Sequence, residues 1–269
     1  MAAAPAYYHY RFDTVDLRDK VVLITGASQG IGAACAAAFR GQGARVAVTA
    51  RSVEKLDRVA ASECLAVPGD ITDHAFRWQL VRDVMRQFGP VDVLVNNAGA
   101  GLYVPSTEAR MEDARAIFEL NVLSPLALTQ LVMPGMRERK AGAIVNVGSI
   151  GGSIPLPWMS LYSASKFALE AWTDGLRMEL DGTGIQVLKV SPGYVKTGFQ
   201  DHAIGGGAPE RLRRAKKFGV TPDEVAQSIV RGLARGSRDV AVPETGRLIS
   251  MLYRIAPRLV EWQMMKMNR

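Results

Sequence analysis

Seven short apolar runs, separated by segments of helical length, constrain the fold of this chain more than any other feature. The runs are VVLIT (21–25), RVAVTA (45–50), CLAVP (64–68), VDVLVN (91–96), GAIVNVG (142–148), IQVLKVS (185–191) and DVAVP (239–243). Strands this apolar are buried on both faces, and helical connections between them are typical of parallel strands. We therefore predict a single-domain Rossmann-type α/β fold, a doubly wound parallel sheet of about seven strands with helices on both faces.

The segments around these runs divide the chain into three parts. We expect an N-terminal arm over residues 1–17, the α/β domain over 18–243 and a helical tail over 244–269. Glycines and charges cluster at 198–220, after the sixth run, and this composition predicts a mobile lid over the substrate. In the tail, four apolar residues recur at helical spacing: Leu248, Met251, Leu252 and Ile255.

Composition and charge exclude some classes of partner. Hydrophobic residues make up 48% of the chain, enough to bury a core, and the net charge is +7. The run RLRRAKK (211–217) supplies five of the basic residues, without interleaved aromatic residues. We expect no nucleic-acid partner; the run is interpreted as a solvated helix face, or alternatively as a contact for an acidic substrate or phosphate.

Cysteine and histidine spacing predicts neither a disulfide nor a metal site. Cys35 and Cys64 are far apart in the sequence, and the three histidines form no HxxH or HExxH pattern. The N-terminal residues lack the basic and apolar regions of a secretory signal. A cytoplasmic location is therefore expected.

The stretch TGASQGIG (25–32) lies between the first apolar run and a helical pattern. Its glycines, Gly26, Gly30 and Gly32, would let the backbone approach a pyrophosphate, and the following helix N-terminus offers free N–H groups. A tight packing turn is the alternative interpretation of the glycines alone. The position favours a dinucleotide site.

The second run ends in VTARS, which places Arg51 where an acidic residue would accept hydrogen bonds from an unmodified ribose. The planar guanidinium can instead pair with a 2′-phosphate. This favours NADP(H) over NAD(H) as the cofactor.

In SLYSASKFALEAW (160–172), Tyr162 and Lys166 are four residues apart at the start of a predicted helix, so they share one face. A lone YxxxK pair is most often an ordinary surface pair. Here it follows five other landmarks in order: TGASQGIG (25–32), GDIT (69–72), NNAG (96–99), Asn121 in ELNVLSP and Ser149 in VNVGSIGG. With this order of motifs, the sequence resembles the short-chain dehydrogenases/reductases over roughly residues 18–243.

The resemblance implies hydride transfer between a nicotinamide cofactor and a carbonyl or alcohol, and it assigns residues to roles. The implied catalytic residues are Asn121, Ser149, Tyr162 and Lys166. The implied cofactor-binding residues are Gly26, Ser28, Gln29, Gly30, Ile31, Gly32, Arg51, Asp70, Ile71, Asn97, Ala98, Gly99, Tyr162, Lys166, Pro192, Gly193, Val195 and Thr197. The implied substrate contacts are Ser149, Gly151, Tyr162 and Tyr194.

Reduction of a ketone builds negative charge on its oxygen, so the site needs a proton donor and a second hydrogen-bond donor. The resemblance gives these tasks to Tyr162 and Ser149. A free phenol has a pKa of about 10, and we expect the cation of Lys166 to lower the pKa of Tyr162. In the family this lysine also binds the nicotinamide ribose, and the asparagine, here Asn121, helps hold a water in a proton relay.

The expected substrate pocket is apolar, which favours a lipophilic ketone, aldehyde or alcohol. Its lining would comprise residues 151–161, Leu102, Tyr103, Tyr194 and the lid. The tail is similar to those of hydroxysteroid and retinol dehydrogenase-like members, whose C-terminal helices flank the pocket. It could pack on its own or a partner subunit, wall the pocket, or touch a membrane surface. The helices after Asn121 and Tyr162 resemble family subunit contacts, which implies a homodimer or homotetramer.

Three functions therefore remain open at this point. The leading one is an NADP(H)-dependent oxidoreductase that interconverts a lipophilic carbonyl and its alcohol. A second enzyme function is reduction of a 3-oxoacyl thioester of acyl carrier protein or CoA, with the run 211–217 steering an acidic carrier. In a third class, the chain would be a catalytically silent NADP-binding regulator with the tail as its partner surface.

Overall fold

The computed structural model describes residues 15–60, 63–205 and 219–267. Most of the expected arm and of the lid, and all of the basic run 211–217, lie outside the described residues.

The sheet has seven strands, all parallel, in the order β3-β2-β1-β4-β5-β6-β7. The strands are β1 (Val21–Thr25), β2 (Arg45–Thr49), β3 (Cys64–Ala66), β4 (Val93–Asn96), β5 (Gly142–Val147), β6 (Ile185–Pro192) and β7 (Asp239–Val242). The chain runs outward in one direction from β1 to β3 and in the other from β4 to β7. This confirms the predicted doubly wound sheet, and the switch point lies between β1 and β4.

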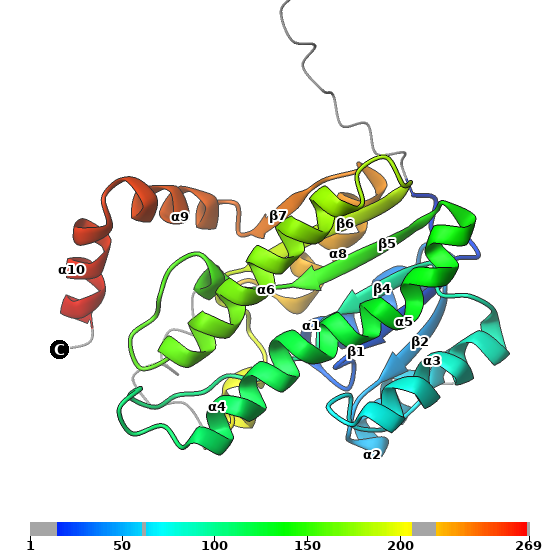
Figure 1. The fold of residues 1–269 in the computed structure, drawn as a ribbon, viewed down its shortest axis with the longest axis horizontal. Helices are drawn as coiled ribbons and strands as arrows, with labels where there is room; N and C mark the ends of the chain where they lie inside the picture. The colour runs from blue at the N-terminus through cyan, green and yellow to red at the C-terminus, as the bar shows by residue number, and fades with distance from the viewer. Residues whose placement is uncertain (1–14, 61–62, 206–218, 268–269) are drawn as a thin grey trace, which may run out of the picture.

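Helices cover both faces of the sheet (Figure 1). One face holds α1 (Gly30–Arg40), α2 (Val53–Ala60) and α8 (Pro222–Ala234); the other holds α3 (His74–Phe88), α5 (Ser124–Arg139) and α6 (Ser160–Glu179). Side chains alternate between the two layers along each strand: Val22 and Ile24 of β1 pack in the first, Val21 and Leu23 in the second. Burial on both faces explains why the strands read as continuous apolar runs.

One long helical stretch differs from expectation. Instead of starting at Asn121, it begins with α4 (Met111–Phe118), passes through a π-helical turn η1 (Glu119–Leu123) and continues as α5. The π-turn absorbs one extra residue without ending the helix, and such turns often mark functional sites. The whole stretch, Met111–Arg139, is long and apolar enough to cross a membrane by length and composition alone. Buried core helices share that property, and α5 packs on the sheet.

The tail forms two helices, α9 (Thr245–Ile255) and α10 (Pro257–Met267), separated at Ala256. They extend away from the body, beyond the carboxyl end of β7 (Figure 1). No residue of α9 is buried. The residues expected on one helix face do lie on α9, and they are exposed in the single chain: Leu248, Met251, Leu252 and Ile255.

Candidate active site

The expected functional segments follow the carboxyl ends of the strands. Residues 26–32 follow β1, 97–99 follow β4, Ser149 follows β5 and 193–197 follow β6. Because all strands are parallel, these segments meet at one edge of the sheet. Arg51 and Asp70 follow β2 and β3, on the other side of the switch point. The segments therefore form two groups, one on each side of the switch point, which we call the adenosine end and the nicotinamide end after the halves of the dinucleotide expected there.

The glycine turn has the backbone geometry that a phosphate site needs. Gly26 and Gly30 have φ values of +66° and +58°, in the left-handed region that favours glycine. A Cβ on Gly32 would lie 2.5 Å from the carbonyl oxygen of Gly26. Gln29 makes no side-chain cap at the start of α1, so the first helical N–H groups point at the turn without a capping side chain. Ser28 and Ile31 are half-buried in the same turn.

Thr25 and Asn97 join β1 to β4 beside this turn. The Thr25 hydroxyl accepts hydrogen bonds from the N–H groups of Asn97 (3.1 Å) and Ala98 (3.0 Å) and donates to the carbonyl of Val95 (3.3 Å). The side-chain amide of Asn97 donates to the carbonyls of Thr25 (2.9 Å) and Gly26 (3.1 Å). The two strand ends are therefore held at a fixed spacing under the expected cofactor.

At the adenosine end, Arg51 is exposed, and its guanidinium forms no ion pair with the described part of the chain. Asp70 is held in a turn, since one carboxylate oxygen accepts hydrogen bonds from the Thr72 amide (2.9 Å) and hydroxyl (2.8 Å). Ile71 is buried beside it. The structure thus leaves Arg51 accessible to an anionic ligand at the end of β2.

The segment after β6 crosses the nicotinamide end. Pro192 ends the strand, and the Gly193 amide donates to the carbonyl of Val242 (2.8 Å). Val195 pairs with Val220. Thr197 lies over the glycine turn, because a Cβ on Gly30 would lie 3.0 Å from its methyl group.

The four residues of the implied tetrad converge at the nicotinamide end. A Cβ on Gly151 would lie 3.2 Å from the Tyr162 ring and 3.4 Å from the Ser149 hydroxyl, so these two side chains are neighbours. A Cβ on Gly99 would lie 3.0 Å from Asn121 Oδ1 and 3.5 Å from Lys166 Nζ. Both tyrosine and lysine are buried on α6, at 6% and 4% exposure.

Asn121 lies at the centre of the π-turn and is fully buried. Its side chain accepts a hydrogen bond from the Ala100 amide (3.0 Å) and donates to the Ala100 carbonyl (3.1 Å) and the Ser165 hydroxyl (3.0 Å). The side chain therefore ties the π-turn to the segment after β4 and to α6.

Burial sets the protonation of the Tyr162 and Lys166 pair. It raises the pKa of Tyr162 to about 12, against a hydrogen bond with Ser149, while the charge of Glu170 raises it further. Burial lowers the pKa of Lys166 to about 8, and the charge of Glu170 opposes this. The expected lowering of the phenol pKa by Lys166 is not found, because desolvation of the phenol dominates. The lysine ammonium instead donates to the Val147 carbonyl (2.9 Å).

An apolar cluster surrounds the reactive phenol. Buried Leu102, Ile117 and Met159 pack with Tyr162, and the partly buried Tyr103, Val104, Phe118, Leu156, Leu161, Phe199 and Ile204 pack against them. The ring of Phe199 lies 5.9 Å from that of Tyr162 in an edge-on arrangement. The expected lining contributes Leu102 and Tyr103 to this cluster, together with Leu156, Met159 and Leu161 from residues 151–161. Phe199 and Ile204 belong to the expected lid. Tyr194 is on the segment after β6, and burial raises its pKa.

Sequence reasoning missed three residues that shape the site: Thr25, Ser165 and Glu170. Glu170 had a signal, since it follows Lys166 by four residues on the same helix. The other two act through contacts between segments far apart in the chain. No local spacing could have indicated them.

Comparisons with known proteins agree with this geometry. The family model for short chain dehydrogenases matches residues 20–204. Dehydrogenase/reductase SDR family member 7B of Danio rerio is 32% identical over 246 residues, which cover 86% of this chain and 79% of that protein. The ketoacyl reductase HetN of Nostoc sp. is 35% identical over 233 residues, which cover 84% of this chain and 79% of that protein.

Solved structures have the same fold. A short-chain dehydrogenase/reductase from Burkholderia phymatum in complex with NAD matches with a TM-score of 0.81 and 25% identity, over 90% of this chain and 96% of that chain. The closed form of a serine dehydrogenase complexed with NADP+ matches with a TM-score of 0.74 and 28% identity, over 82% and 94%. The fold, the family match and these relatives together show that this chain belongs to the short-chain dehydrogenase/reductase family.

Proposed function

We propose that this chain is an NADP(H)-dependent oxidoreductase that interconverts a lipophilic ketone or aldehyde and its alcohol. One observation carries the proposal: a buried phenol, Tyr162, lies beside the Ser149 hydroxyl and one helical turn from a buried ammonium, Lys166, at the nicotinamide end of the sheet. This is the set of groups that carbonyl reduction needs.

The nicotinamide supplies the hydride when bound; the chain supplies the proton and the charge stabilisation. With its pKa raised to about 12, Tyr162 is protonated at neutral pH and can donate its proton to the carbonyl oxygen. The Ser149 hydroxyl donates a hydrogen bond to the same oxygen as negative charge develops on it. Lys166 stabilises the phenolate that remains, and it does so only while it carries its own proton.

Arg51 supports the choice of NADP(H). Its exposed guanidinium at the end of β2 suits a 2′-phosphate. Of the related structures, one holds NAD and one NADP+. We expect Arg51→Ala to raise the KM for NADPH about tenfold, the lower range for a charge-assisted contact at an exposed site, with little change for NADH. Arg58→Ala on the exposed face of α2 is the control; equal losses for both cofactors would contradict the assignment.

The apolar cluster around Tyr162 supports a lipophilic substrate. Reduction of a 3-oxoacyl thioester is the second candidate, favoured by the similarity to a ketoacyl reductase. The test is oxidation of NADPH and NADH by purified protein with steroid, retinoid, long-chain aldehyde, small ketone and acyl thioester substrates. Turnover of a lipophilic carbonyl supports the first candidate, and turnover of thioesters alone supports the second. Cofactor binding without any turnover would contradict both and favour a silent cofactor-binding regulator.

We also propose that residues 18–243 form the catalytic domain, with 198–220 as a substrate lid and 244–269 as a peripheral tail, in a cytoplasmic homodimer or homotetramer. The exposed apolar face of α9 supports a covering partner for the tail, since large apolar patches rarely stay in water. Light scattering of the full chain and of a chain ending at residue 243 tests whether a second copy covers it. Co-sedimentation with anionic vesicles tests contact with a membrane.

A further inference from the structure

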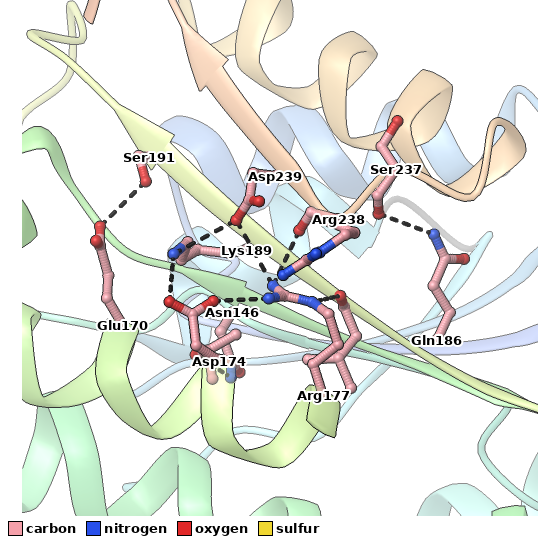
Figure 2. A network of polar contacts seen from close by, with 12 residues as sticks. Asn146, Glu170, Asp174, Arg177, Gln186, Lys189, Ser191, Ser237, Arg238 and Asp239 are labelled. Carbon is pink, nitrogen blue, oxygen red and sulfur yellow. Dashed lines mark hydrogen bonds and ion pairs between the residues drawn. The ribbon is translucent and has the colours of Figure 1, made fainter. Parts of the chain in front are cut away.

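Besides Tyr162 and Lys166, helix α6 carries another buried ionisable residue, Glu170. Glu170 follows Lys166 by one helical turn and is 8% exposed. Its carboxylate accepts hydrogen bonds from the Ser191 hydroxyl (3.1 Å) and the Ser153 hydroxyl (3.2 Å). Figure 2 shows Ser191 of β6 meeting Glu170 of α6. A carboxylate this deeply buried is retained only where partners compensate its desolvation.

The two serines belong to segments that carry functional groups. Ser153 directly follows the short helical turn η2 (Ile150–Gly152), which Ser149 caps through its hydroxyl. Ser191 directly precedes Pro192 in the segment expected to hold the nicotinamide. One carboxylate on α6 therefore joins the proton-donor helix, the Ser149 turn and the cofactor segment.

Two glycines make room for this carboxylate. A Cβ on Gly152 would lie 2.7 Å from the carboxyl carbon of Glu170, and a Cβ on Gly148 would lie 3.2 Å from its Oε1. They are two of the three glycines in VNVGSIGG, which contains Ser149. Their small size is thus explained by the Glu170 side chain.

The charges around Glu170 come from three elements (Figure 2). On α6 it lies between Lys166 and Asp174; β6 contributes Lys189, which donates to Asp174 (2.7 Å) and lies 3.4 Å from Asp239 of β7. Arg177 of α6 completes this group and also pairs with Asp174 and Asp239. Burial raises the pKa of Glu170, and Lys189 opposes this.

In its charged form, Glu170 changes the pKa values of Tyr162 and Lys166, which precede it on α6. Its charge raises the pKa of Lys166, and thus opposes the loss of the lysine proton that burial favours. The same charge raises the pKa of Tyr162. Both effects keep protons on the two groups that the reduction needs protonated.

We propose that Glu170 is a positioning residue for carbonyl reduction: through its two serine contacts it holds the Ser149 turn and the cofactor segment against α6, and it places a carboxylate charge one helical turn from Lys166. This inference rests on the proposed function of Tyr162 and Lys166. Glu170 acts through them and touches neither substrate nor cofactor.

The test is the pH profile of carbonyl reduction by Glu170→Gln, which removes the charge and conserves the volume. Without that charge, Lys166 and Tyr162 both lose their protons at lower pH, so the alkaline fall of kcat shifts down by about one pH unit. Glu179→Gln, at the exposed end of the same helix, is the control and keeps the wild-type profile. If kcat of Glu170→Gln falls at the same alkaline pH as that of the wild type, the inference is overturned. Loss of a purely structural residue would lower kcat without changing the pH at which it falls.

A second variant keeps the test decisive if Glu170→Gln does not fold. Gly152→Ala places a methyl group against the carboxyl carbon of Glu170 and displaces its charge. The alkaline fall of kcat should therefore shift to lower pH in this variant too. Gly175→Ala is the matched control, since a Cβ there meets nothing within 4 Å. If kcat of Gly152→Ala falls at the same alkaline pH as that of the wild type, the inference is equally overturned.

Failure of this inference differs from failure of the proposed function. If Tyr162→Phe retains turnover, the proposed function fails. If Tyr162→Phe is inactive while kcat of Glu170→Gln has the wild-type dependence on pH, only the proposed role of Glu170 fails.

Discussion

Two threonines at the same register of neighbouring strands are predicted to respond in opposite ways to one substitution. Thr25 of β1 and Thr49 of β2 are register partners, and both are buried, at 1% and 0% exposure. The Thr25 hydroxyl makes three hydrogen bonds that join β1 to the segment after β4. The Thr49 hydroxyl has no hydrogen-bond partner among the described residues.

Valine has the shape of threonine, so the substitution isolates the hydroxyl. Thr25→Val leaves the Ala98 amide without its acceptor, while the Asn97 amide keeps the Val95 carbonyl (3.0 Å). An unsatisfied buried amide costs about 1 to 3 kcal/mol. Ala98 is half-buried, so water compensates part of the loss, and we expect destabilisation by about 1 to 2 kcal/mol. Thr49→Val removes an unpaired buried hydroxyl and should stabilise by about 1 kcal/mol.

The measurement is denaturant unfolding of both variants and of the wild type, followed by circular dichroism. Thr25→Val should also weaken NADPH binding, because the Ala98 amide is no longer held to β1 beneath the expected cofactor. Thr49→Val should unfold at higher denaturant concentration than the wild type. Equal destabilisation of the two variants would refute the reasoning, since it would show that the hydrogen bonds of Thr25 contribute nothing specific.

The rate of carbonyl reduction should fall as pH rises through about 8, because Lys166 loses its proton there and no longer stabilises the phenolate; a constant kcat well into the alkaline range would contradict this. Thr221→Ala should destabilise the fold by about 1 kcal/mol, because its hydroxyl and the Glu224 side chain form a reciprocal cap at the start of α8. Denaturant unfolding measures this loss, and the matched variant Thr183→Ala, whose hydroxyl donates to the Leu180 carbonyl outside any helix start, separates a cap from an ordinary hydroxyl contact.

The sheet was predictable because its signal is local and repeated. A strand buried on both faces must be apolar throughout, so each of the seven strands was visible as an apolar run in the sequence. The predicted and observed strand boundaries differ by a few residues. Spacing also predicted the turn at Gly26 and the shared helix face of Tyr162 and Lys166. The roles of these residues came from the order of motifs that the chain shares with the family.

The environment of the phenol could not be predicted in the same way. The sequence places Lys166 next to Tyr162, which suggested a lowered phenol pKa, but burial by distant segments raises it. Likewise the hydrogen bonds of Thr25 and the serine partners of Glu170 join segments far apart in the chain. Desolvation and contacts of this kind depend on the assembled fold.

The proposed reduction depends on transfer of the Tyr162 proton to the carbonyl oxygen, and Tyr162→Phe tests this step. Tyr162→Phe removes the phenolic hydroxyl and keeps the ring that packs against Phe199. The measurement is kcat with the best carbonyl substrate, alongside the Kd of NADPH by fluorescence titration. We expect kcat to fall by at least about a hundredfold while the Kd of NADPH stays unchanged. Turnover close to that of the wild type would contradict it.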